Sequence, residues 1–405
     1  MHLDIITFTP VIITFMWSII LVSSSKSNKA KFFLGIFMFD TFLLFLSHLI
    51  YYNELKNIYI YFDLIFVFSS LSVFPMYYCY IKLLTFETHS KIKDIKYLLP
   101  AILMLIATSV TYLLMTPKLR DVYVNEYLYA SGKINGAPLL IKIQLILNFT
   151  LQIIYFVQII YSLLKIRFLI IKYNNRIANF YSNLENRTLE WPKMILYSFV
   201  LMSIGNVFTS FLGRSYFIQS TNLLLIPATG FSILIFIFGY LGNLQNNTIV
   251  ISEMDNTVFQ PENNDILEVV EQKYEEQNKT KDYENIHQNK LKIKLLELFE
   301  IEQVFKNKDL KISDIAIKLN TNRSYISNII NTDYNCSFSS FVNQYRVDAA
   351  KVLLLNEDCN NLCLEHISSL VGFGSLHSFI RVFKEITKTT PGRYRETNNK
   401  NVNVA

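Results

Sequence analysis

Apolar positions dominate the chain as far as Gly242, where they form long runs separated by short polar stretches. A run of about 20 apolar residues is long enough to cross the hydrocarbon core of a bilayer as a helix. The pattern predicts seven such spans: Leu3–Val22, Phe32–Tyr52, Ile58–Leu84, Tyr97–Met115, Leu139–Leu164, Met194–Leu212 and Thr221–Gly242. The fifth run continues to Ile171, so this helix is expected to protrude from the bilayer.

Lysine and arginine are distributed unevenly over the predicted loops. The first, third and fifth loops, together with Lys82 at the end of the third span, hold thirteen of them, whereas the second, fourth and sixth hold five. Positive residues concentrate in the cytoplasmic loops of membrane proteins, so the odd-numbered loops are predicted to be cytoplasmic. With seven spans, the N-terminus then lies outside and the C-terminal part lies inside.

Two acidic residues, Asp40 and Asp63, lie within predicted spans, where a charge is costly. One interpretation makes them a signal or ion site inside the helix bundle. The other makes them partners in hydrogen bonds between helices, which fix the packing. The sequence leaves both interpretations open.

After Gly242 the chain becomes polar and divides into two further parts. Residues 243–287 carry 3 Lys or Arg against 10 Asp or Glu, and residues 288–405 carry 16 against 12. The acidic part is interpreted as a linker, either a partly disordered spacer or a short dimerising helix. The mild positive balance of the last part permits contact with phosphate without proving it. The predicted domains are therefore 1–242, spanning the membrane, the cytoplasmic linker 243–287, and 288–405.

The last domain begins with an amphipathic pattern over residues 286–305, followed by two short predicted helices. Ser313 is the expected N-cap of the first short helix and Asn322 that of the second. Small Ala316 lies where the two helices should cross. The second helix is expected to bury Ile326, Ile329 and Ile330. Two short helices joined by a tight turn form a helix-turn-helix unit.

The same arrangement recurs nearer the C-terminus. A long helix is predicted from about Phe338 to Leu355, followed by a short helix over 365–371 and a turn of two glycines around Phe373. Ser375 is the expected cap of a last helix that buries Phe379, Val382 and Phe383. At 1.5 Å per residue the long helix measures roughly 27 Å. That length is comparable to one turn of DNA, about 34 Å, so the two units fit successive major grooves.

The residues of this domain carry a resemblance to a known family. The segment from about Leu310 to Arg395 resembles the AraC/XylS-type DNA-binding domain. The matching pieces are Ile315-Ala316, Ser324-Tyr325-Ile326-Ser327, Ser337-Phe338, Tyr345-Arg346, Ala350, Leu353-Leu354, Ile367, Val371-Gly372-Phe373, Ser378-Phe379, Val382-Phe383-Lys384, Thr390-Pro391 and Tyr394-Arg395. The combination of seven spans with this domain also resembles membrane-anchored AraC-type regulators of bacteria.

The resemblance implies a regulator of transcription, usually an activator, that places one helix of each unit in the major groove. The base readers it implies are Ser324, Ser327, Asn328, Leu376, His377, Ile380 and Arg381, with Arg323 and Lys384 on phosphate. Paired hydrogen bonds make Arg381 the best candidate for guanine and Asn328 for adenine. The apolar Leu376 and Ile380 could meet thymine methyls.

Some positions depart from the family pattern. Asn335 and Lys388 stand where the family has glycine, which favours a left-handed backbone there. Ser368 replaces the usual alanine, and the loop from Asn356 to Cys363 is about three residues longer. Arg346 is expected to be a structural ion-pair partner rather than a base reader.

Catalytic patterns are absent from the sequence: it has no Gly-rich phosphate loop and no Ser/His/Asp set. Cys359 and Cys363 have a spacing that a metal could use, but no second pair completes four ligands. No enzyme activity, metal or cofactor is therefore predicted.

The sequence as a whole predicts an all-α protein: a seven-helix membrane bundle followed by a double helix-turn-helix domain. The leading hypothesis is a one-component transcription regulator of the bacterial inner membrane that senses a signal through its spans. The alternative is a receptor or transporter whose cytoplasmic tail docks a protein partner. Expected partners are double-stranded DNA, the lipid bilayer and a second copy of the chain, with RNA polymerase and an unidentified signal ligand as further candidates.

Overall fold

The described residues form helices joined by loops, and these parts of the chain contain no strand beyond one isolated β-bridge. The computed structural model describes residues 2–26, 28–85, 96–130, 136–185, 187–189, 225–244, 289–356 and 362–402, with a few positions between 192 and 200. The chain divides into two compact units, Met1–Ile171 with Leu189–Ile249, and Lys172–Thr188 with Val250–Ala405.

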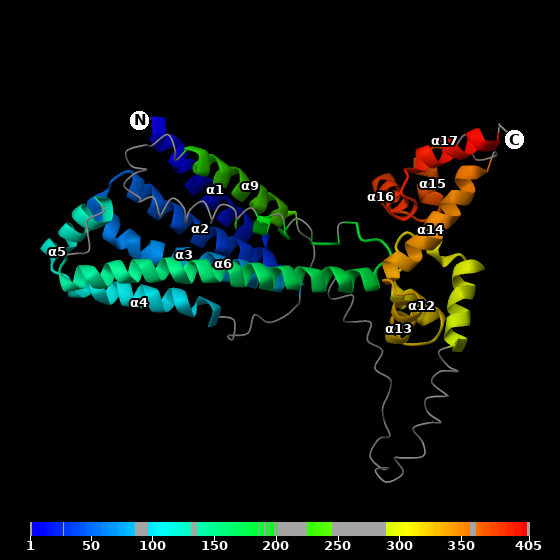
Figure 1. The fold of residues 1–405 in the computed structure, drawn as a ribbon, viewed down its shortest axis with the longest axis horizontal. Coiled ribbons are helices and arrows are strands. Elements are labelled where there is room, and N and C mark those ends of the chain that lie inside the picture. The colour runs from blue at the N-terminus through cyan, green and yellow to red at the C-terminus, as the bar shows by residue number, and fades with distance from the viewer. Residues whose placement is uncertain are drawn as a thin grey trace, which may run out of the picture. The chain divides into compact units, whose positions relative to one another are not determined.

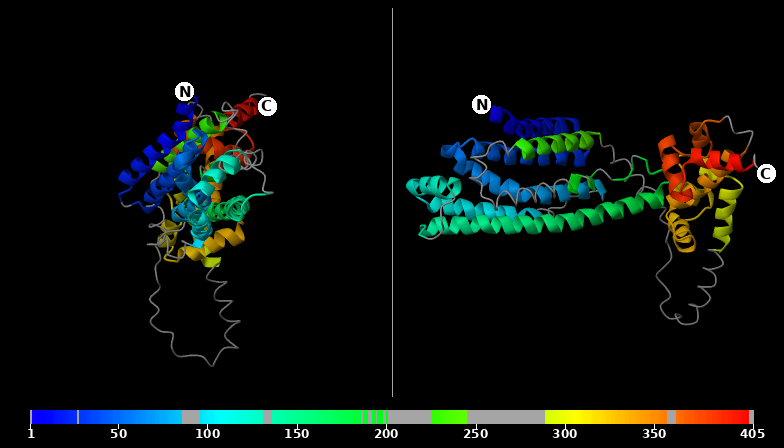
Figure 2. Two further views of the ribbon diagram at one scale, coloured as in Figure 1. Left: turned by 90° about the vertical axis from the view of Figure 1, so that its left-hand side faces the viewer. Right: turned by 45° about the horizontal axis from the view of Figure 1, so that its top comes forward.

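Unit 1 is a bundle of long apolar helices (Figure 1; Figure 2). Its elements are α1 (His2–Ser24), α2 (Lys29–Tyr52), α3 (Lys56–Thr85), α4 (Leu99–Leu114), α5 (Pro117–Val122), the π-helix η2 (Tyr123–Tyr129), α6 (Leu139–Phe180) and α9 (Leu225–Asn243). Helix α1 packs against α2 and α9, α2 against α3, and α3 against α4. The last turns of α6, from residue 172, belong to unit 2.

Four described helices are long and apolar enough to cross a membrane: Lys29–Tyr52, Lys56–Thr85, Lys96–Leu114 and Leu139–Phe180. At the predicted first and seventh spans, within α1 and α9, the described apolar stretches are Phe8–Ser24 and Ala228–Asn243. Most of the predicted sixth span (194–212) and the linker beyond Leu244 lie outside the described residues, as does Cys359. The seven-span bundle therefore stays a prediction.

Unit 2 contains the C-terminal helices. A helix over residues 289–300 is followed by the 3-10 turn η4 (Val304–Lys306), α12 (Ile312–Lys318), α13 (Arg323–Asp333), α14 (Phe338–Leu355), α15 (Leu364–Leu370), α16 (Leu376–Thr387) and α17 (Pro391–Val402). Figure 1 shows α12 and α13 at one end of α14, and α15, α16 and α17 at the other. The two short-helix pairs are thus joined by α14.

Two local predictions for this unit were wrong. Ser313 is not an N-cap: it is buried inside α12, which begins at Ile312 after the extended residue Lys311. The carboxylate of Asp314 caps the helix start instead, by accepting the backbone N–H of Lys311 at 2.8 Å. The amphipathic helix predicted over 286–305 ends near residue 300, and Gln303 has a left-handed backbone (φ 52°).

Residues 172–188, termed here the docked segment, join unit 2 from a distant part of the chain. Tyr181 forms an antiparallel bridge with Lys311. The backbone N–H of Ser182 donates to the carbonyl of Leu310 at 3.1 Å, and the hydroxyl of Ser339 donates to the Ser182 carbonyl at 3.0 Å. Ser182 is only 1% exposed, so this segment is part of the packed unit.

Candidate nucleic-acid interface

The first helix-turn-helix unit is formed by α12 and α13. Asn322 caps α13 as predicted, its side-chain oxygen accepting the backbone N–H of Ser324 at 3.1 Å. The expected apolar face is buried and consists of Ile326, Ile329 and Ile330, with Ala316 buried on α12. Burial of that face leaves the opposite, polar face of α13 directed away from the core.

The second unit is formed by α15 and α16. Ser375 caps α16 as predicted, its hydroxyl accepting the backbone N–H of Ser378 at 3.2 Å. In the turn before it, Gly372 has φ +89°, and a Cβ there would lie 2.6 Å from the carbonyl oxygens of Phe305 and Lys306. Only glycine fits this position. The buried face of α16 is the predicted one: Phe379, Val382 and Phe383.

The predicted DNA contacts lie on the faces of α13 and α16 that the core leaves open. The exposed ones are Ser324, Asn328, His377, Arg381 and Lys384. The half-buried ones are Arg323, Ser327, Leu376 and Ile380. Leu376 also packs against the core of the second unit, so part of its surface is already occupied. Their role in reading DNA stays a prediction.

Arg346, on α14, is a structural residue, but the prediction that it forms an ion pair was wrong. Its side chain is 1% exposed, and it donates from Nε to the carbonyl of Phe305 and from Nη2 to that of Asn307, both at 2.8 Å. Nη2 also lies 3.2 Å from the hydroxyl of Ser182. Its hydrogen bonds therefore go to uncharged oxygens, and burial lowers the pKa of Arg346 to about 10, although the charge of Asp309 acts in the opposite direction.

The two positions where glycine was expected have the backbone that glycine would favour. Asn335 has φ 48° and Lys388, which ends α16, has φ 64°. The prediction of a left-handed backbone at both is confirmed. Asparagine adopts this conformation at little cost, whereas lysine does so less readily.

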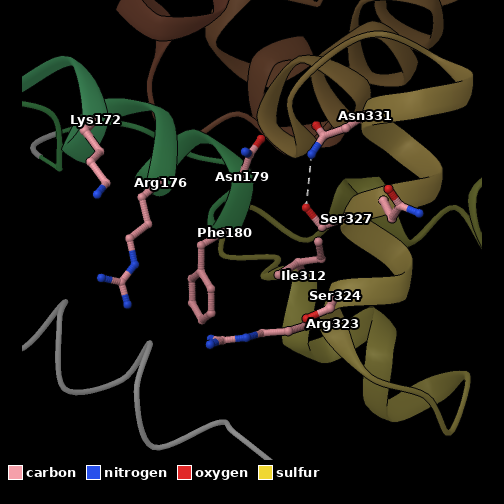
Figure 3. A pocket seen from close by; sticks show the side chains of 10 residues that line it. Lys172, Arg176, Asn179, Phe180, Ile312, Arg323, Ser324, Ser327 and Asn331 are labelled. Carbon is pink, nitrogen blue, oxygen red and sulfur yellow. Dashed lines mark hydrogen bonds between the residues drawn. The ribbon is translucent and has the colours of Figure 1, made fainter. Parts of the chain in front are cut away.

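A groove of about 540 Å³ runs along the open face of α13 (Figure 3). Lining residues from α13 are Arg323, Ser324, Ser327, Asn328 and Asn331, and those from the end of α6 are Lys172, Arg176, Asn179 and Phe180. In Figure 3 the side chain of Arg323 extends beneath the ring of Phe180, and its guanidinium carbon lies 5.9 Å from the ring centre. The reading face of α13 thus faces the docked segment.

Comparison with known proteins identifies this domain. A family model described as a helix-turn-helix domain matches residues 315–397. The chain is 30% identical over 94 residues to a protein named "Probable transcription factor PqrA" from Proteus vulgaris, covering 75% of that protein and 23% of this chain. The chain belongs to the AraC-type helix-turn-helix family.

Other relatives share the AraC-type domain but not the rest of the chain. Identity is 33% over 88 residues to the HTH-type transcriptional regulator YtdP of Bacillus subtilis, which covers 22% of this chain and 11% of that protein. The chain is also 33% identical over 87 residues to the Msm operon regulatory protein of Streptococcus mutans. This match covers 22% of this chain and 30% of that protein. The chain therefore spans less than a third of these two relatives, and the likeness extends to the AraC-type domain alone.

The two predicted signal residues, Asp40 and Asp63, belong to unit 1. Asp40, on α2, accepts hydrogen bonds from the hydroxyls of Ser69 (2.9 Å) and Ser72, both on α3. Asp63, on α3, accepts the hydroxyls of Tyr59 (3.1 Å) and, from α4, Tyr112 (2.5 Å). Both carboxylates are buried and link neighbouring helices, as the packing interpretation predicts. The signal interpretation stays a prediction.

Sequence reasoning missed several residues beside the reading face of α13. Asn331 lies seven positions after Ser324 and donates to Ser327 at 3.2 Å, so the spacing of a helix face would have found it. Lys172, Arg176 and Asn179 had no such signal. Their place beside the AraC-type domain follows from a contact between segments far apart in the sequence.

Proposed function

We propose that the protein is a membrane-embedded, one-component transcription regulator that reads DNA with α13 and α16. The observation that carries this proposal is the pair of helix-turn-helix units joined by α14, each with a capped helix whose polar face the core leaves open. The 18 residues of α14 correspond to roughly 27 Å, which suits adjacent major grooves. Membership of the AraC-type family supports the same function.

Each reading residue has a role that its chemistry suits. The exposed guanidinium of Arg381 pairs with guanine and the exposed amide of Asn328 with adenine, because both can make two parallel hydrogen bonds to a base edge. Ser324, Ser327 and His377 add single hydrogen bonds, and Leu376 and Ile380 contact thymine methyls. Arg323 and Lys384 contact phosphate, which positions the domain without reading sequence.

The membrane part of the proposal is supported by the four long apolar helices and by the charge of the predicted loops. The protein then lies in the bacterial inner membrane, with its N-terminus outside and the AraC-type domain in the cytoplasm. A signal in the bundle, at Asp40 or Asp63, shifts the equilibrium between two arrangements of the chain. Two copies bind paired sites, and RNA polymerase is the partner on the promoter.

The test uses the full-length chain in lipid nanodiscs. Duplexes that it prefers are selected from a random-sequence pool, and binding is measured for the wild type and Arg381→Ala. We expect at least tenfold weaker binding of the variant to the selected duplex, because one bidentate base contact is lost. Lys318→Ala serves as the control and should change affinity less, because it removes a cation of α12 that is already paired with Glu302.

The alternative, a receptor whose tail docks a protein, predicts a different outcome. The selection would then yield no preferred duplex, and binding would be weak, salt-sensitive and blind to sequence. Equal binding by Arg381→Ala and the wild type would also contradict the proposed readout by α16.

A further inference from the structure

The docked segment touches both helices that the proposed function assigns to DNA. At α13, the last turns of α6 form the opposite wall of the groove along the reading face (Figure 3). At α16, the carboxylate of Glu185 accepts a hydrogen bond from the hydroxyl of Ser375 at 2.9 Å. Ser375 is the N-cap of α16, directly before the predicted base readers Leu376 and His377. One short segment therefore reaches the DNA-facing side of both units.

The contact is anchored by buried groups rather than by chance surface contacts. Phe180, Tyr181 and Ser182 are all at most 4% exposed. Ser182 alone makes three polar contacts with unit 2, to Leu310, to Ser339 and to the guanidinium of Arg346. These bonds hold the segment in register on the domain.

Beyond these anchors, Arg187 places its guanidinium 4.5 Å from the centre of the Tyr181 ring and 3.9 Å from the carboxylate of Asp309. The side-chain nitrogen of Asn183 lies only 2.4 Å from where a Cβ on Gly374 would be. The segment is thus closely packed against the turn that precedes α16.

The charge of Glu185 bears directly on DNA binding. A helix N-terminus favours an anion, and here the protein's own carboxylate has that place. A phosphate brought to the start of α16 would meet this like charge at close range. The ring of Phe180 and the side chain of Arg323 also lie together beside the reading face of α13. The docked segment therefore occupies surface that the proposed function assigns to DNA.

We propose that residues 172–188 are an intramolecular competitor of DNA, so that the domain binds its site only when this segment leaves the reading faces. The inference rests on the proposed function. Helix α6 contains residues of both units, and movement of α6 is then a direct way for a signal in unit 1 to release the domain. Apparent affinity for DNA falls in proportion to the fraction of molecules in the released state.

The cations that line the groove suggest the opposite hypothesis, in which the end of α6 helps to bind DNA. Lys172, Arg176 and Arg323 line it, and positive side chains could extend the DNA-binding surface along α6. That arrangement does not explain why Glu185 places a negative charge at the N-terminus of α16. The two hypotheses predict opposite effects of fixing the segment in place.

A reversible disulfide distinguishes them. The Cγ of Asn183 lies 3.4 Å from the Cβ built on Gly374, so Asn183→Cys with Gly374→Cys places two thiols within bonding reach. The two cysteines are introduced into full-length protein whose four native cysteines are replaced by serine, and this protein is reconstituted in nanodiscs. The DNA is a duplex selected from a random pool with the reduced protein. We expect the oxidised protein to bind it at least tenfold more weakly and dithiothreitol to restore binding, which also shows that the variant is folded.

Each single-cysteine variant is the matched control and should show no dependence on oxidation. A second variant, Glu185→Ala, should bind the duplex several-fold more tightly than the wild type, whereas Glu302→Ala removes the same charge elsewhere in the unit and should not. Equal or tighter binding by the oxidised pair would overturn the inference and leave the proposed function intact. If even the reduced protein shows no sequence preference, the proposed function fails and this inference fails with it.

Discussion

Replacing Lys388 by glycine should stabilise the second helix-turn-helix unit. Lys388 ends α16 with φ 64°, a conformation that costs a non-glycine residue about 1–2 kcal/mol. Glycine removes that strain but loses about 0.5–1 kcal/mol through the greater freedom of the unfolded chain. The exposed bond from Lys388 Nζ to the carbonyl of Glu385 (2.9 Å) is also lost, at about 0.3 kcal/mol. The expected net gain is about 0.5 kcal/mol.

Hydrogen exchange of the full-length protein, followed by mass spectrometry, measures this gain. A stabilisation of about 0.5 kcal/mol corresponds to roughly twofold slower exchange of the protected amides in α16 and α17. Lys388→Ala is the matched control, because it loses the same side-chain bond but keeps the strained backbone. Asn335→Gly should gain less, since asparagine tolerates φ 48° better.

Equally slow exchange in Lys388→Ala and Lys388→Gly would show that backbone strain at Lys388 does not limit the stability of the unit. The gain would then come from removing the lysine side chain and not from relief of the backbone.

The remaining predictions concern Gly372, Arg346 and Asp40. Gly372→Ala should destabilise unit 2 by about 3 kcal/mol, because its Cβ would meet two carbonyl oxygens at 2.6 Å. Limited proteolysis should detect this as faster cleavage. Gly392→Ala is the control: the nearest atom to its Cβ is 3.9 Å away, so it should resist the protease like the wild type. Arg346→Met should cost about 2–4 kcal/mol by leaving the carbonyls of Phe305 and Asn307 unpaired, as a denaturant titration of the intact protein would show. Burial holds the pKa of Arg346 in the folded protein at about 10, below its value in the unfolded chain. The cost of burying its charge is therefore present below that pH and is relieved above it. The difference in unfolding free energy between the wild type and Arg346→Met should grow as the pH rises through about 10. If Asp40 is a signal residue, Asp40→Asn should change the response of a reporter strain to its signal. An unchanged response, at normal protein levels, would show that Asp40 serves only in the packing of α2 against α3.

Local patterns predicted most of the helices of unit 2. The helix Phe338–Leu355 has the predicted bounds, because Ser337 caps its start and its apolar positions recur at helical spacing. The caps Asn322 and Ser375 were predicted for the same reason, since a side-chain oxygen before an apolar helix satisfies free N–H groups. The reading faces followed from the buried faces opposite them.

Contacts between distant segments account for what the sequence could not predict. Ser313 looked like an N-cap, but Lys311 is held extended by its bridge to Tyr181, and α12 begins earlier. The docked segment is anchored largely by hydrogen bonds to backbone groups, as at Ser182, and such bonds leave no periodic pattern in the sequence. For that reason the groove beside α13 could not be predicted from the sequence.

Chromatin immunoprecipitation of the full-length protein from intact cells, with sequencing of the recovered DNA, tests most directly whether this chain reads DNA. We expect a small set of sharp chromosomal sites that share one motif. These sites should be lost together in Arg381→Ala and Asn328→Ala proteins that are still present in the membrane fraction. Recovery of DNA spread evenly over the chromosome, unchanged in both variants, would contradict sequence-specific binding by α13 and α16.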